Sequence, residues 1–157
     1  MKPKDKKAFI IYVLLSLVLW QLCVSLSKII TKQYIKADDL IFSVVETTNK
    51  GAAFGLFNDN PYVLGTLGTI VLVIVLFYVY KNVKFEDKTK ILSCAVFTSG
   101  ILGNTAERFN NGYVTDFIKL NFFDFPVFNL YDILITVSVF MYLFYCIKEE
   151  AQKRKKN

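Results

Sequence analysis

The chain has 157 residues, of which 54% are hydrophobic, 16% aromatic and 20% charged, and its mean hydropathy is +0.42. A soluble domain of this length carries more charge and fewer apolar residues, so the composition excludes an ordinary soluble globular domain. The chain contains no histidine, which excludes Ser-His and Cys-His nucleophilic pairs and His-ligated zinc sites. These totals predict a single integral membrane domain over residues 1–157.

The net charge is +6, and most of the basic residues lie beside the apolar runs. Thirteen of the nineteen Lys and Arg residues fall in three segments, residues 1–7, 81–90 and 148–157. This arrangement is typical of the positive-inside rule and not of a nucleic-acid groove, so no nucleic-acid partner is expected. It predicts that both termini and the 81–90 loop face the cytoplasm.

The three cysteines lie in separate apolar runs, and no CxxC spacing joins Cys23, Cys94 or Cys146. Cysteines in such runs are most simply buried small apolar residues. We therefore expect neither disulfides nor metal ligands, and the sequence predicts no metal and no cofactor.

The first apolar run covers residues 8–27, which hold no charge and would form about 30 Å of helix, enough to cross a bilayer. A signal peptide also begins with positive charge and an apolar run, but this run is too long and no small-x-small site follows it. It is predicted to be a retained transmembrane helix. Residues 28–36 then mix charged and apolar side chains, as an interfacial helix does.

The segment before the second apolar run is predicted to lie outside the membrane. Residues 40–45 have the pattern of a short strand, and residues 46–57 that of a turn with a small apolar return. The Gly-Ala-Ala stretch at 51–53 either lets a backbone approach a partner closely or forms an ordinary hairpin turn.

Three further spans are predicted at residues 61–80, 91–106 and 129–147. The third has sixteen uncharged residues, about 24 Å of helix, which is short of a hydrocarbon core of about 30 Å. Glu107 and Asp132 should therefore lie near the outer boundary and face the helix bundle. The expected fold is an all-α membrane protein with four transmembrane helices, a small extracytoplasmic β-strand and loop cradle, and an interfacial helix.

Two aspartates, Asp116 and Asp132, occupy short polar islands between apolar runs, where a carboxylate is costly and functional by default. Each has a plainer explanation: Asp132 fits the first turn of a helix capped by Asn129, and Asp116 fits a turn after Gly112. As a pair, however, two neighbouring carboxylates share one proton. The ionised member can activate water while the protonated member donates to a peptide carbonyl, without a metal.

Four ordered blocks carry a family resemblance: NKGAAF at 49–54, GNTAER at 103–108, GYVTDF at 112–117 and FNLYD at 128–132. With four spans in the same order, the chain resembles the lipoprotein signal peptidases, also called signal peptidase II or prolipoprotein signal peptidases. Each block alone is a weak signal, but the four together are specific and extend the likeness over nearly the whole chain.

The resemblance implies an aspartyl endopeptidase of the bacterial inner membrane with its active site at the extracytoplasmic face. Such enzymes cut the signal peptide from a diacylglyceryl-modified prolipoprotein just before the lipidated cysteine, and globomycin inhibits them. Asp116 and Asp132 match the catalytic aspartates. The residues that match the family's polar positions around substrate and dyad are Asn49, Asn104, Arg108 and Asn129. The expected partners are the lipid-modified precursor and membrane lipids, and the expected state is a monomer.

Arg108 is expected to bind a carbonyl or carboxylate, with a snorkelling interfacial cation as the alternative. The sequence departs from the family pattern at Trp20, where aspartate is usual before Gln21, at Glu107, where aspartate is usual, and at Tyr131, where a small residue is usual. Substrate range and the packing of the first span are the properties that these changes affect.

Two other functions would also fit a small membrane protein with acidic residues. A catalytically inactive relative could bind lipoprotein precursors or act as a membrane scaffold. A small transporter could also use intramembrane acids, but it should carry polar residues throughout its spans. Here the spans are nearly free of ionisable groups and the acids gather at one face, which favours the peptidase.

Overall fold

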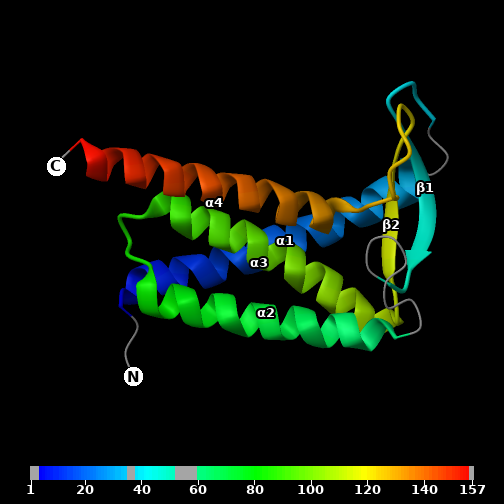
Figure 1. The fold of residues 1–157 in the computed structure, drawn as a ribbon. Helices are drawn as coiled ribbons and strands as arrows, with labels where there is room; N and C mark the ends of the chain where they lie inside the picture. Colours follow the sequence, from blue (N-terminus) through cyan, green and yellow to red (C-terminus); the bar gives the residue numbers. More distant parts are fainter. Residues whose placement is uncertain (1–3, 35–37, 52–59, 156–157) are drawn as a thin grey trace.

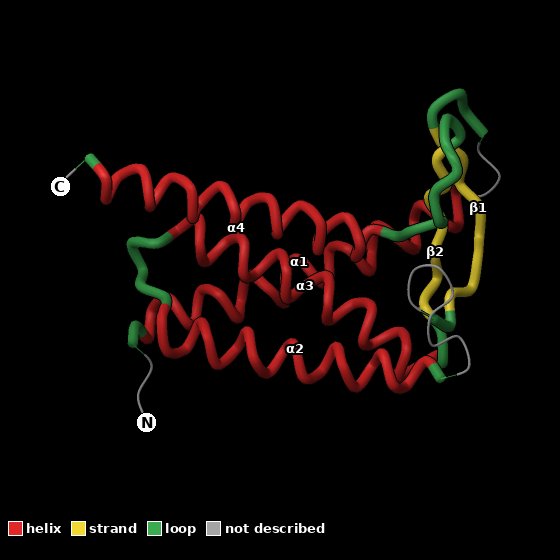
Figure 2. Tube along the Cα trace, viewed as in Figure 1, coloured by secondary structure: helices red, strands yellow, loops and turns green. Residues whose placement is uncertain are grey.

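The computed structural model describes residues 4–34, 38–51 and 60–155, which form a helical bundle with a small sheet at one end (Figure 1). Its elements are α1 (Lys6–Tyr34), β1 (Phe42–Asn49), α2 (Pro61–Asn82), α3 (Lys88–Asn111), β2 (Val114–Leu120) and α4 (Leu130–Arg154). The helices lie side by side, and Figure 2 shows both strands gathered at one end of them. Helix α1 begins, and α4 ends, at the opposite end (Figure 1).

Helices α1, α2 and α4 are long and apolar enough to cross a membrane. Their large apolar side chains point outward: Leu14 is 58% exposed, Phe77 57% and Phe140 68%. Outward apolar faces suit hydrocarbon and would be unstable in water. The protein is therefore an integral membrane protein, as the composition predicts.

Helix α3 is not among the candidate membrane spans found in the described part of the chain. It lies at the centre of the bundle, packed against α1, α2 and α4 (Figure 1). Its buried positions are mostly small or polar: Ser93, Cys94, Ala95, Ser99, Gly100, Gly103 and Thr105. A helix surrounded by other helices need not be apolar, which explains why only three of the four expected spans have a membrane-grade composition.

Small residues let α3 and α4 approach closely. A Cβ atom added at Gly103 would lie 2.2 Å from the ring of Tyr131, and one at Gly100 would lie 2.6 Å from the backbone oxygen of the same residue. On the other side, the Ser99 hydroxyl donates a hydrogen bond of 3.0 Å to the carbonyl of Ser16 in α1. The bulky Tyr131 thus packs into space that a glycine leaves open.

Two predicted elements near the sheet need correction. Residues 28–34 continue α1 as one helix, so no separate interfacial helix is seen there. Strand β1 begins later than expected and runs on to Asn49, so residues 46–49 are strand and not turn. Antiparallel pairing with β2 accounts for this, because Thr47 lies opposite Asp116 and Asn49 opposite Val114. Of the rest of the predicted turn, residues 50–51 follow the strand, and residues 52–57 lie outside the described residues.

The helix ends follow local chemistry. Gly112 terminates α3 with a φ of 76°, and its N–H donates to the carbonyl of Arg108, a conformation that favours glycine. Asn129 caps α4 in a capping box with Asp132, as the sequence predicts. All three cysteines are free; Cys23 and Cys94 are buried as expected, but Cys146 is exposed on α4.

Candidate active site

A cavity of about 580 Å³ lies where the sheet meets the beginning of α4. Its polar lining consists of Asn49, Arg108, Asp116 and Asp132. The remaining lining is almost entirely apolar and comes from Leu120, Phe125, Pro126, Val127, Phe128, Ile133, Thr136 and Val137. The two predicted aspartates therefore border one cavity, although β2 carries one of them and α4 the other.

Asp116 is held in the sheet and is only 2% exposed. Because Asn49 lies two residues after Thr47, the strand partner of Asp116, its side chain is on the same face of the sheet. The Asn49 amide donates a hydrogen bond of 2.8 Å to Asp116 Oδ2, and the Asn129 amide donates one of 2.7 Å to Asp116 Oδ1. Both carboxylate oxygens thus have an amide donor.

Asp132 lies in the first turn of α4 and has two donors of its own. Its Oδ2 accepts from the backbone N–H of Asn129 at 3.1 Å, and its Oδ1 accepts from the side-chain amide of Asn104 at 2.8 Å. The helix-capping role that the sequence left open is therefore present. The same carboxylate also faces the cavity, so capping does not exclude a role in the site.

Asn129 connects the two carboxylates. Its amide nitrogen donates to Asp116 and, at 3.2 Å, to Asn104 Oδ1, while its Oδ1 accepts from the backbone N–H groups of Tyr131 and Asp132 at 2.7 and 3.1 Å. The residue is 1% exposed. A buried network with each member satisfied holds its groups in fixed positions.

Arg108 binds carbonyl groups within the protein. Its Nη2 donates to the carbonyl of Gly51 at 3.0 Å and its Nη1 to the carbonyl of Asn104 at 3.2 Å. Its Nε is buried and has no acceptor among the residues described. The side chain lines the cavity and joins β1's end to α3, so it does not behave as a snorkelling cation.

Sequence reasoning missed two features of the site. Glu107 was assigned no role in the site from the sequence, but its Oε2 accepts the backbone N–H of Thr115 at 2.8 Å, directly beside Asp116. The apolar wall formed by residues 125–128 was also unassigned. The run NFFDFPVF at 121–128 was a signal for it, because so many exposed aromatic residues need a partner surface.

Burial dominates the electrostatics of Asp116. It raises the pKa of this carboxyl from 3.8 to about 6, and the nearby charge of Asp132 acts in the same direction. The hydrogen bonds from Asn49 and Asn129 and the charge of Arg108 partly oppose this rise. In the described residues, no group of three or more Cys, Asp or Glu side chains could hold a metal ion. The two carboxylates thus border one cavity and interact electrostatically.

Known proteins resemble this chain in sequence and in fold. The sequence model of the family described as signal peptidase (SPase) II matches residues 9–148. A lipoprotein signal peptidase of Streptococcus thermophilus is 36% identical over 118 residues, which cover 75% of this chain and 76% of the relative. One of Clostridium tetani is 33% identical over 122 residues, covering 76% of each chain.

Solved structures agree in fold. A structure described as a bacterial membrane enzyme, solved by the in meso method at 2.3 Å resolution, superposes with a TM-score of 0.79 at 22% identity, covering 98% of this chain and 96% of the other. At that identity the likeness concerns the fold alone. The family match, which spans most of the chain, and relatives above 30% identity establish that this chain belongs to the signal peptidase II family.

Proposed function

We propose that this protein is an aspartyl endopeptidase that removes the signal peptide from diacylglyceryl-modified prolipoproteins, with Asp116 and Asp132 as its catalytic pair. The observation that carries the proposal is the position of Asn129, which hydrogen-bonds the Asp116 side chain and, through its backbone, the Asp132 side chain. Both carboxylates also line one cavity. Relatives named lipoprotein signal peptidase support the substrate class.

The proposed reaction begins with one proton on the carboxylate pair. The ionised carboxylate takes a proton from water, whose oxygen attacks the scissile carbonyl carbon, while the protonated carboxyl donates its proton to the carbonyl oxygen. A gem-diol then forms. When it collapses, its C–N bond breaks and the leaving nitrogen takes a proton from the pair, which regains one from the diol. The raised pKa of Asp116 favours a shared proton.

The other polar residues bind and position in this proposal. Asn49, Asn104 and Asn129 fix the carboxylates through the hydrogen bonds described above. Arg108 already binds two carbonyl groups and retains a buried Nε donor with no acceptor in the described residues, so it is suited to a substrate carbonyl. The apolar wall of the cavity suits the hydrophobic residues and lipid of a precursor.

The membrane arrangement is also part of the proposal. We place all four helices across the bacterial inner membrane, because α3 lies alongside three helices that can span it (Figure 1). The basic segments at the ends of the chain and at 81–90 would then face the cytoplasm, and the sheet with its cavity the extracytoplasmic side. The protein would act as a monomeric, single-domain peptidase.

A precursor-cleavage assay tests the function. Purified protein in detergent or vesicles is given one precursor peptide in two forms, with and without the diacylglyceryl group on its cysteine. We expect cleavage of the lipid-modified form only, immediately before that cysteine, as read by product mass, and inhibition by globomycin. Binding of the modified peptide without cleavage would identify an inactive relative, and ion flux across proteoliposomes without cleavage would identify a transporter; either result refutes the proposal.

A further inference from the structure

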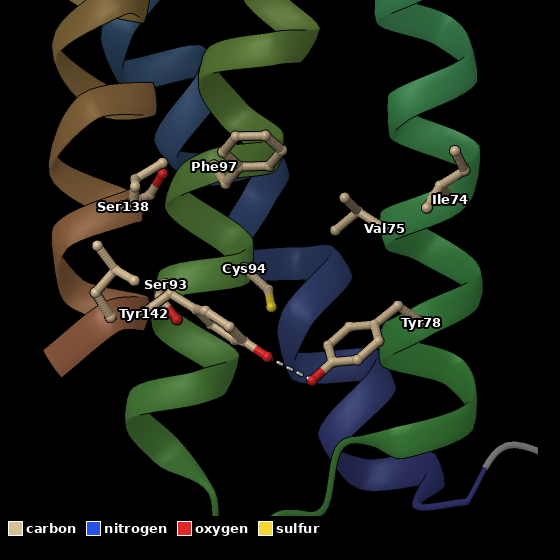
Figure 3. A pocket seen from close by; sticks show the side chains of 10 residues that line it. Ile74, Val75, Tyr78, Ser93, Cys94, Phe97, Ser138 and Tyr142 are labelled. Carbon is tan, nitrogen blue, oxygen red and sulfur yellow. Dashed lines mark hydrogen bonds between the residues drawn. The ribbon is translucent and has the colours of Figure 1, made fainter. Parts of the chain in front are cut away.

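A second cavity lies in the half of the bundle far from the sheet and has no part in the proposed reaction. It has a volume of about 360 Å³ and opens between α2 and α4, with α3 as its floor. Figure 3 shows Val75 of α2, Cys94 and Phe97 of α3 and Ser138 of α4 around it. We refer to this cavity as the α2–α4 groove.

The α2–α4 groove is closed on one side by a pair of tyrosines. The hydroxyls of Tyr78 and Tyr142 lie 2.7 Å apart in a hydrogen bond that joins α2 to α4 in front of α3 (Figure 3). The rest of the lining is mainly apolar, including Ile74, Val139 and Leu143. An apolar cavity between two helices that face hydrocarbon is filled by whatever apolar chain the bilayer supplies.

The side chain of Lys90 lies at one end of the α2–α4 groove. Lys90 lies on the same face of α3 as Ser93, Cys94 and Phe97, one turn nearer the end of the bundle. Its Nζ lies 5.9 Å from the ring centre of Tyr78 and 5.1 Å from that of Tyr145. No ion pair of Lys90 is found among the described residues. Asp87, three residues before Lys90, attracts it electrostatically, and it lines a neighbouring hollow together with Glu86 and Glu149.

A groove with an apolar body and a cation at its end matches the chemistry of a phospholipid. Basic pockets between membrane helices bind anionic headgroups, and each lysine near the surface contributes about 1 kcal/mol. We propose that the α2–α4 groove binds an anionic phospholipid, with one acyl chain in the groove and the phosphate at Lys90 and the tyrosine hydroxyls. This site is independent of the carboxylate pair, which lies beside the sheet.

Photolabelling with two matched lipids tests the site. The full-length protein is placed in phosphatidylcholine vesicles that contain either phosphatidylglycerol or phosphatidylcholine with the same diazirine-bearing acyl chain. After illumination, peptide mass spectrometry locates the adducts. We expect the groove residues of α2 and α4 to be labelled about fivefold more by the anionic lipid, which corresponds to about 1 kcal/mol.

Matched variants separate the headgroup from the acyl chain. In Lys90→Gln the preference for the anionic lipid should disappear, whereas Lys81→Gln should retain it, because Lys81 lies over the Phe77 ring away from the groove. Val139→Trp fills the groove and should abolish labelling of it by both lipids. Phe140→Trp, at the next and more exposed position, should leave it unchanged. Each variant should still cleave precursor, which verifies that it is folded.

Three results would overturn the proposal. One is equal labelling of the groove by both lipids, and another is a preference that survives Lys90→Gln. The third is an unlabelled groove in a protein that elutes as a dimer and becomes a monomer in Val139→Trp, since a second copy would then occupy the groove.

Discussion

Asp132 and Asp116 border the same cavity, but the protein supports their carboxylates in different ways. Asp132 belongs to a helix start, and one of its donors is the backbone N–H of Asn129, three residues before it. Asp116 belongs to a two-stranded sheet, and its donors come from Asn49, 67 residues earlier, and Asn129, 13 residues later. Local geometry fixes the first carboxylate, whereas tertiary structure fixes the second.

The site therefore has two separate requirements, the capped start of α4 and the docking of the sheet against it. A capped helix presents Asp132 wherever α4 begins, because the capping box forms within four residues. Asp116 reaches the cavity only when β1 pairs with β2 and the sheet docks on the start of α4. The docking includes backbone hydrogen bonds from Phe117 and Ile118 to the carbonyl of Phe128. Among the residues described, Asn129 alone hydrogen-bonds both carboxylates.

Because Asn129 supports both carboxylates, its substitution should have the largest effect on cleavage and stability together. We expect Asn129→Ala to lower the cleavage rate about 100-fold, since Asp116 loses an amide donor and Asn104, which donates to Asp132, loses the amide that orients it. It should also lower the free energy of unfolding by about 1 kcal/mol, because α4 loses its N-cap. Initial rates on a lipidated precursor and thermal unfolding in detergent measure the two effects.

The matched control is Asn129→Ser. Serine is a good N-cap residue but is too short to donate to Asp116 across the same gap. Its thermal stability should return close to that of the native protein, while the cleavage rate stays low. If serine restored the rate as well, Asn129 would serve only as a helix cap, and the comparison would fail.

The titration of Asp116 should have a smaller effect than the Asn129 substitution, and it should appear in the pH dependence of stability. Its pKa is raised from 3.8 to about 6, chiefly by burial, so the folded protein holds this proton more tightly than the unfolded chain. The free energy of unfolding must then fall as the pH rises from about 4 to about 6. Compared with Asp116→Asn, the native protein should lose about 4–8 °C of Tm over this range, the change that about 2 kcal/mol produces.

Thermal unfolding at a series of pH values provides this measurement. Asp124→Asn, a change at an exposed carboxylate outside the cavity, controls for general effects of pH. A constant difference between the native protein and Asp116→Asn from pH 4 to 7 would show that Asp116 titrates normally and is not desolvated.

The two carboxylates also differ in how far the sequence alone could predict them. The position of Asp132 followed from local rules, because an N-cap asparagine with an acidic residue three positions later predicts the start of a helix. For Asp116, local rules offered a turn after Gly112, whereas the residue lies in β2. The link between Asn49 and Asp116 depends on strand pairing across 67 residues, and only the family resemblance placed both in one site.

The misjudged elements have related physical causes. The end of β1 looked like a turn because Glu46 to Asn49 is polar, yet pairing with β2 keeps it extended. Helix α3 was expected to resemble its neighbours, but its central position selects small and polar residues in place of apolar ones. In both cases, contacts with distant segments outweighed the local pattern.

The most direct test of the account compares Asp116→Asn, Asp132→Asn and the double variant in the cleavage of a lipidated precursor, with folding verified by thermal unfolding. Two carboxylates that share one proton act as a unit, so their losses should not multiply. We predict that each single change lowers the rate at least about 1,000-fold and that the double variant is no slower than either. A single variant that retains more than about a tenth of the native rate, or losses that multiply in the double variant, would contradict a shared catalytic pair.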